Sequence, residues 1–482
     1  LSPLAMVVGL SLASSYALAA DVDTKAVEEE KIEKINVLGS YIKGSDTVSA
    51  NPVSVVTAEE MEYTGAVDTA DLVNLLPVNS GAENRPDTFT SFYNQGTSNV
   101  NLRGLGLSST LVLINGKRQT LSGAKAQDGS VFVDTSSIPA IAIDRVEVLK
   151  EGAAAAYGSD AVAGVVNFVT NDHYEGVKVS GSYHTIDGYD QNDKNMSILA
   201  GFELGDSSHV VMAASILRRS NLRGWERPDL VQAAASSLGT GFKMTADSVV
   251  TEGPWAGTYA AGEQVGNPNC AAVGGNILDL DGDGDIDRCG FKYGLHYNII
   301  NEEEREQYYA SLTHTFANDI EFKSAVTYSD YRIIDNFSVP SLPNLSFPTI
   351  SASNATNPFG VDVIIFGRHN PTLDFNQSRP APRTNETFRL EAGLTGVFSN
   401  DWDWSTSLAY STNEYDITQP EMSLSRLFLA MDGKGGPNGD KTFDHFSTDL
   451  QNDPEVLDWL KTDFKSTTKT SLVVWDGVVN GE

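Results

Sequence analysis

Apolar and polar residues alternate in many stretches of about ten residues in the second half of the chain. In one of them, Phe388, Leu390 and Ala392 alternate with polar residues such as Arg389 and Glu391. A period of two predicts β-strands with one apolar and one polar face. The pattern predicts about eight strands, in residues 176–185, 195–205, 208–219, 304–333 (two strands), 384–415 (two strands) and 467–482.

The connections between these strands are very unequal in length. Tight turns are expected at Gly205-Asp206, Asn318 and Asn400, whereas the alternate connections, about 219–302, 334–383 and 417–464, are very long. Short turns at one end and long loops at the other are typical of an outer-membrane barrel. A soluble β-sandwich shows the same alternation, but a compact sandwich rarely carries three such loops.

The first half of the chain has a different pattern, because helical and strand segments are mixed between residues 50 and 172. Thr57 and Glu60 form a predicted capping box, and Asp68 is expected to cap a short helix that ends before Pro77. Asn115-Gly116 between apolar residues predicts a tight hairpin. The predicted fold class is therefore an α+β domain followed by an antiparallel transmembrane β-barrel. Eight closed strands could not enclose a domain of this size, so the barrel is expected to be incomplete in this chain.

The N-terminal segment does not fit either pattern. Residues 1–20 are apolar and end in Ala17-Leu18-Ala19, which predicts a secretory signal peptide, and 21–49 form a charged tether. The predicted organisation is a signal peptide (1–20), a tether (21–49), an α+β domain (50–172) and barrel strands with long external loops (173–482).

Composition excludes some function classes. The 482 residues include 64 acidic and 33 basic side chains, a formal net charge of -31, which disfavours nucleic acid as a partner. Nucleotide-binding, zinc-protease and serine-hydrolase motifs are absent, and the seven histidines are dispersed. No enzyme activity and no required cofactor are expected.

One acidic loop lies between two cysteines. Asp279, Asp281 and Asp283 occupy positions 1, 3 and 5 of an EF-hand-like loop, and Asp285 and Asp287 follow. Position 12 lacks the glutamate of a calcium sensor, so the prediction is a weak structural Ca²⁺ site in an external loop, closed by a Cys270–Cys289 disulfide. An acidic solvated turn is the alternative. A secreted calcium-binding adhesin is the alternative for the whole protein.

The segments "NVNLRGLGLSSTLVLINGKR" and "DRVEVLKEGAAAAYGSDAVAGVVNFVT" resemble the plug domain of TonB-dependent outer-membrane receptors in order and spacing. The later strands resemble the first third of that family's barrel. Residues 33–40, with Ile35, Asn36 and Val37 at their centre, resemble the TonB box, the segment on which the energy-transducing protein pulls.

The resemblance implies active transport of a siderophore, cobalamin, oligosaccharide or peptide across the outer membrane. It implies the TonB–ExbB–ExbD complex and outer-membrane lipid as partners, with the plug towards the periplasm and the long loops outside the cell. It leaves the ligand open. Arg103, Arg145, Glu147 and Lys150 are polar positions on otherwise apolar strands of the plug-like domain. They are expected to form ion pairs with the barrel wall, and solvated strand faces are the alternative.

Overall fold

The computed structural model describes residues 53–66, 68–84, 89, 94–150, 154–335, 337–338, 347–365 and 379–481. The expected signal peptide and tether lie outside these residues. Within them, no helix combines the length and the apolar character needed to cross a membrane.

The N-terminal domain is a five-stranded sheet with short helices. The sheet order is β1-β4-β5-β2-β3, with β2 and β5 parallel and the other pairs antiparallel. Its elements are β1 (Val53–Thr57), α1 (Ala58–Tyr63), α2 (Thr69–Asn74), η2 (Leu107–Ser109), β2 (Thr110–Ile114), β3 (Lys117–Arg118), η3 (Thr135–Ser137), η4 (Ala140–Ala142), β4 (Ile143–Leu149), α3 (Ala154–Tyr157), η5 (Ser159–Ala161) and β5 (Gly164–Thr170).

Both predicted helix caps of this domain are present. The Glu60 carboxylate accepts a hydrogen bond from the Thr57 backbone N–H (3.0 Å), and the Thr57 hydroxyl accepts one from the Glu60 N–H (3.3 Å). Asp68 caps α2 by accepting a hydrogen bond from the Asp71 N–H (2.9 Å). Asn115 and Gly116 have φ of 52° and 74°, as the tight hairpin between β2 and β3 requires. These local predictions are confirmed.

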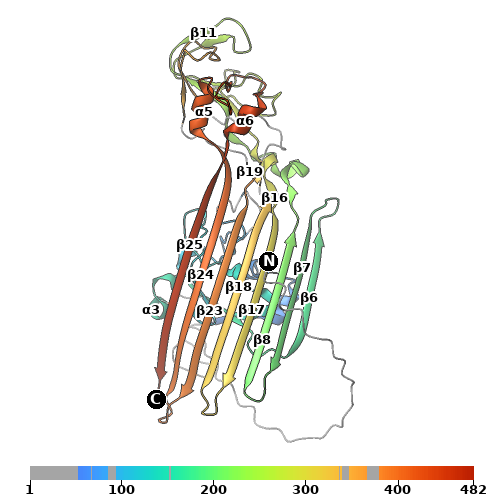
Figure 1. Cartoon of the computed structure of the whole chain (residues 1–482), viewed down its shortest axis with the longest axis vertical. Helices are drawn as coiled ribbons and strands as arrows, with labels where there is room; N and C mark the ends of the chain where they lie inside the picture. The colour runs from blue at the N-terminus through green and yellow to red at the C-terminus, as the bar shows by residue number, and fades with distance from the viewer. Residues whose placement is uncertain are drawn as a thin grey trace.

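The second half of the chain forms one antiparallel sheet, which we call the wall. Its order is β25-β24-β23-β18-β17-β8-β7-β6 (Figure 1), so all eight predicted strands are present. The strands are β6 (Gly176–Thr185), β7 (Asn192–Glu203), β8 (Ser208–Arg219), β17 (Glu302–Thr315), β18 (Glu321–Asp335), β23 (Arg383–Val397), β24 (Asp403–Met422) and β25 (Lys461–Asn480).

The two faces of the wall have different surroundings. Along β17 buried residues such as Gln307, Tyr309 and Ser311 alternate with partly exposed ones. The N-terminal domain lies against one face of the sheet (Figure 1). The buried side chains are the ones that meet this domain, because Gln307 and Tyr309 both form hydrogen bonds with it.

The three long connections were expected to be loops, but their described residues fold together. We call the described residues within 224–300, 347–365 and 423–460 the cap, which lies beyond one end of the wall (Figure 1). The elements between the wall strands are β9 (Leu222–Arg223), η6 (Gly224–Glu226), α4 (Pro228–Val231), β10 (Ser236–Met244), β11 (Ser248–Val250), β12 (Gly257–Tyr259), β13 (Gln264–Gly266), β14 (Asn276–Leu278), β15 (Arg288–Phe291), η7 (Tyr293–His296), β16 (Asn298–Ile300), β19 (Phe337–Ser338), β20 (Thr349–Ile350), β21 (Val363–Ile365), β22 (Arg379–Pro380), α5 (Leu424–Met431) and α6 (Pro454–Leu460).

An apolar core holds the cap together. Trp255 lies at its centre, with Phe242 and Phe359 both at 5.5 Å between ring centroids and Phe446 stacked on Phe242 at 4.6 Å. The Trp255 indole N–H donates to the Phe446 carbonyl (2.8 Å), which joins the first connection to the third. Strand β10 pairs with β21, which joins the first connection to the second. The cap is therefore a folded unit built from three separate connections.

Candidate functional site: the interface between the N-terminal domain and the wall

The outward face of the wall carries an apolar band. Tyr308, Tyr328 and Phe388 are cross-strand neighbours in one row. Exposed apolar side chains such as Leu390 and Trp475 lie on the short-turn side of that row. The next row on the cap side is charged and contains Glu306, Asp330, Glu386 and Glu414. An apolar band edged by aromatic side chains is typical of strands that cross a membrane.

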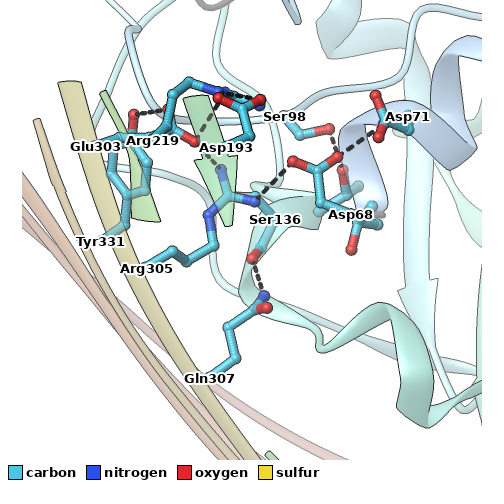
Figure 2. A network of polar contacts seen from close by, with 12 residues as sticks. Asp68, Asp71, Ser98, Ser136, Asp193, Arg219, Glu303, Arg305, Gln307 and Tyr331 are labelled. Atoms are coloured by element: carbon cyan, nitrogen blue, oxygen red, sulfur yellow. Dashed lines mark hydrogen bonds and ion pairs between the residues drawn. The ribbon is translucent and has the colours of Figure 1, made fainter. Parts of the chain in front are cut away.

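The opposite face of the wall meets the N-terminal domain through two polar clusters. The first is a chain of charged side chains (Figure 2). Arg305 of β17 lies 3.3 Å from Asp68 of the N-terminal domain and 3.9 Å from Glu303. Arg219 of β8 pairs with Glu303 (2.9 Å) and with Asp193 of β7 (3.0 Å). We call these five residues the charged cluster.

The charged cluster is shielded from water. The side chains of Glu303 and Arg305 are 3% and 6% exposed, and that of Asp68 is 13% exposed. The Tyr331 hydroxyl donates to Glu303 (3.0 Å), and the Arg305 guanidinium lies 5.0 Å from the centre of the Tyr331 ring. Gly96 of the N-terminal domain fits against this ring because a Cβ there would lie 1.5 Å from it. Removing a wall charge such as that of Arg305 leaves an excess of carboxylate charge in this low-dielectric site.

The second cluster surrounds the tip of the β2–β3 hairpin, and we call it the hairpin cluster. Arg389 of β23 is 2% exposed and donates to the carbonyl oxygens of Arg118 (3.0 Å) and Ile114 (3.2 Å). It also pairs with Glu391 (2.6 Å), which accepts a hydrogen bond from Asn115 (2.6 Å). The wall therefore satisfies backbone carbonyls of the tight turn that Asn115-Gly116 makes.

Neutral hydrogen bonds extend the hairpin cluster across β23 and β24. The Ser411 hydroxyl accepts from the Thr120 N–H (2.9 Å), and the Oδ1 atom of the Asn413 side chain accepts from the Gly123 N–H (2.7 Å). A Cβ at Gly123 would lie 2.7 Å from the backbone oxygen of Thr468, so the chains approach closely here.

One buried carboxylate of the N-terminal domain lies between the two clusters. Asp134 accepts hydrogen bonds from the Ser98 N–H (2.9 Å) and from Asn385 of the wall (2.6 Å). Burial raises the pKa of Asp134 above its usual range, although hydrogen bonds from Ser136 and Ser98 and the charge of Arg305 oppose this shift. Acidification therefore favours the buried position of this carboxyl group, because burial costs less for the protonated form.

Apolar contacts also join the two parts, in two small groups. Leu107, Ala124 and Phe132 pack with Tyr415 of the wall in one of them. Ala142 packs with Leu199, Val211, Ala213 and Tyr309 in the other. The larger clusters lie inside the N-terminal domain and inside the cap. The interface is therefore held by polar and apolar contacts together.

The expected ion pairs between the wall and Arg145 or Glu147 are not found. Arg145 pairs with Asp144 (2.8 Å) and Glu147 (2.9 Å), and Glu147 also accepts from Asn167 (3.0 Å). All of these residues belong to the N-terminal domain, so the prediction was wrong for Arg145 and Glu147. The reason is their register, since β4 lies between β1 and β5 and places Glu147 beside Asn167.

The other two predicted positions are exposed. Arg103 has φ of 58°, so it lies in a turn and not on a strand, and it donates to the Ala163 carbonyl (3.0 Å) within the same domain. Lys150 is exposed at the end of β4. The TonB-box-like residues Ile35, Asn36 and Val37 lie outside the described residues.

The acidic loop is on the cap. Cys270 and Cys289 form a disulfide with a sequence separation of 19. Asp279, Asp281 and Asp283 are exposed and can bring one oxygen each within 4.8 Å of one another. The Asp287 carboxylate accepts from the Leu280 N–H (2.5 Å), so it closes the loop. The calcium site, with Asp285 as a further carboxylate, stays a prediction.

Sequence reasoning missed the charged wall residues of both clusters, which are Asp193, Arg219, Glu303, Arg305, Arg389 and Glu391. The available signal was the polar side of each alternating strand. Charged and amide side chains recur there at every second position, as in Glu303, Arg305 and Gln307. That pattern predicts a polar face, but the partner of each side chain depends on how the N-terminal domain docks.

The comparisons with known proteins agree with this arrangement. Residues 45–165 match the family model "TonB-dependent Receptor Plug Domain". This part of the chain is a plug domain of the TonB-dependent receptor type. We call the described residues 53–170, which contain most of this match, the plug, and the wall is the sheet against which the plug lies.

Individual relatives are distant. The chain is 28% identical over 173 residues to an iron-regulated outer membrane virulence protein of Vibrio cholerae, a match that covers 35% of this chain and 24% of that protein. The chain therefore matches about a quarter of the length of this curated relative. The solved ferric enterobactin receptor of Pseudomonas aeruginosa, a mutant in complex with enterobactin, is 14% identical with a TM-score of 0.38, covering 89% of this chain and 56% of that one.

Proposed function

We propose that the protein takes up a scarce or large ligand across the outer membrane, with energy from the TonB–ExbB–ExbD complex. The observation that carries the proposal is a plug domain bound to the inner face of a membrane-type wall. Polar contacts form much of that interface. They can be exchanged for contacts with water, so the plug can be rearranged without exposing a large apolar core.

The ligand is proposed by class only. Siderophores, cobalamin, oligosaccharides and peptides fit this architecture equally well, because fold does not determine the ligand. The relative from Vibrio cholerae is described as iron-regulated, which makes ferric siderophores the first class to test. The adhesin alternative leaves the plug domain without a role.

The test is transport by cells that carry a deletion of residues 33–40, which contain Ile35, Asn36 and Val37. A gene-deletion strain is first screened on ferric siderophores, cobalamin, oligosaccharides and peptides as sole sources of the scarce nutrient. Cells with the 33–40 deletion are expected to lose uptake of the identified nutrient and to keep its binding. Uptake that continues in the deletion variant, or in cells that lack TonB, would contradict the proposal.

A further inference from the structure

The order of the plug–wall contacts along the chain, counted from β1, distinguishes one of them. Among the described strands, β1 is an edge strand whose one partner is β4. Among the described residues from Val53 onward, Asp68 is the first whose side chain forms a hydrogen bond or ion pair with a wall side chain. Any pull on the chain before β1 therefore reaches the Asp68–Arg305 pair before the other polar plug–wall contacts.

We propose that the Asp68–Arg305 pair is a release latch for the segment from β1 to α2, with Arg305 as its positioning residue. The proposal rests on the function proposed above, because that function supplies the pull. The hairpin cluster is attached to residues 114–123, which follow α2 by about forty positions. The latch can open while the hairpin remains bound to the wall.

The charges of the wall explain why this pair can separate. Without Asp68, the charged cluster contains two arginines, Arg219 and Arg305, and two carboxylates, Glu303 and Asp193, so its formal charge is zero. When Asp68 leaves, Arg305 keeps Glu303 and the Tyr331 ring as neighbours. Each of these four charges keeps an oppositely charged neighbour, which keeps the cost of opening low.

Asp68 both caps α2 and carries the negative charge of the latch, and a substitution can remove the charge while it keeps the helix cap. One Asp68 oxygen accepts from the Asp71 N–H and the other from Arg305. Asparagine is as good an N-cap as aspartate, so D68N removes the charge and keeps the cap. R305M has a larger expected effect, because Asp68 then faces a wall cluster of net charge -1.

The matched control is Asp453 in the cap. It caps α6 by accepting from the Glu455 N–H (2.9 Å) and pairs with Lys441 (2.5 Å), but this pair is partly exposed and far from the plug in sequence. D453N therefore makes the same chemical change at a helix cap and ion pair that is not part of the latch.

The experiment measures opening of α2 with a single thiol. Val73 of α2 is fully buried and both native cysteines are in the disulfide, so V73C gives one thiol that reacts with a maleimide only when α2 leaves its site. In the purified full-length protein, R305M is expected to raise the labelling rate by about tenfold to a hundredfold. D68N is expected to raise it less, R305K least, and D453N not at all.

The double variant D68N/R305M should label no faster than R305M alone. Equal labelling rates for R305M, D68N and the parent would overturn the latch. This measurement needs neither ligand nor TonB, so its failure leaves the transport function standing. Loss of TonB-dependent uptake by the parent protein would instead overturn the proposed function.

Labelling in cells separates a latch from a contact that only supports the fold. V73C in the otherwise native protein is expected to be labelled only when TonB is present, and R305M should be labelled with or without it. The amount of SDS-resistant barrel should be unchanged. A strict TonB requirement for R305M, or a fall in its barrel level that accounts for the labelling, would show that Arg305 is not a latch.

Discussion

The plug–wall interface and the cap use opposite chemistry to join segments that are far apart in sequence. The plug is bound to the wall by ion pairs and hydrogen bonds such as Arg305–Asp68 and Ser411–Thr120, with two small apolar groups. The cap is built around Trp255 and fourteen other buried apolar or sulfur-containing side chains of its own, with Met422 of β24 packed against them, and it carries a disulfide. The first interface can separate in steps, whereas the second is expected to unfold as a unit.

The difference follows from what each region exposes when it opens. Polar groups released from the wall can bind water, so a rearranged plug remains compatible with a wet barrel interior. An opened cap would expose aromatic side chains to water at about 25 cal/mol per Å² of apolar surface. We therefore expect the cap to remain folded while the plug moves.

The largest expected effect is that of W255A on the cap. Replacing a buried tryptophan by alanine costs about 3–5 kcal/mol, and the Phe446 carbonyl also loses its donor. Limited proteolysis should then cut all three connections, because their core is shared, while the wall keeps its SDS-resistant mobility on gels. Cleavage confined to the first connection would show that the cap is not one unit.

Removal of the disulfide is expected to destabilise the cap less than W255A does. The C270S/C289S variant frees a loop with a sequence separation of 19, which costs about 3 kcal/mol in the chain-entropy model. Protease sensitivity should rise in the cap, and V73C labelling of the plug should not change. Faster labelling of the plug would show that the cap and the plug–wall interface are coupled, contrary to the comparison.

The strands of the wall and the helix N-caps of the plug could be predicted from the sequence, because neighbouring residues determine them. Alternation of side chains fixes which residues of β17 or β23 share a face, and Asp68 caps α2 through its own neighbours. The folded cap beyond the end of the wall could not be predicted in this way. Its core joins Phe242, Phe359 and Phe446 from three connections, and no period in any one of them indicates the other two.

Ion pairs between the plug and the wall were predicted, but the residues that form them were not. Arginines facing the interface were expected on the plug, at Arg103 and Arg145, whereas the structure places Arg305 and Arg389 on the wall. Arg145 finds Glu147 two residues away on its own strand. This local partner neutralises the charge of Arg145 without any contact with the wall. The sequence pattern does not distinguish such a local pair from a long-range pair.

A smaller effect is expected for one neutral contact of the plug–wall interface. S411A leaves the buried Thr120 N–H without its acceptor, which costs about 1–3 kcal/mol. The hairpin region should then exchange its amide hydrogens faster, with little change in the cap. Thr412 lies next to it on the outward face and is the matched control as T412A. Equal effects of S411A and T412A would mean that this hydrogen bond does not hold the plug.

The smallest expected effect is that of calcium on the cap. Asp279, Asp281 and Asp283 can each bring an oxygen within 4.8 Å of the others. A backbone hydrogen bond from Asp283 lowers the pKa of Asp281, but desolvation and the charges of Asp283 and Asp287 together outweigh it, so the pKa of Asp281 is raised. With an affinity in the weak extracellular range, ~10⁻⁴–10⁻³ M, millimolar calcium would stabilise the loop by about 0.5–1.5 kcal/mol.

Calcium should therefore slow protease cleavage between Cys270 and Cys289 and leave V73C labelling of the plug unchanged. The D279N/D283N variant keeps the size of both side chains and should lose this protection. The protection should also weaken as the pH falls, because Asp281 becomes protonated at a higher pH than an ordinary aspartate. If cleavage is independent of calcium in the native loop, the five aspartates form a solvated acidic turn, and the stability of the cap rests on its apolar core and disulfide.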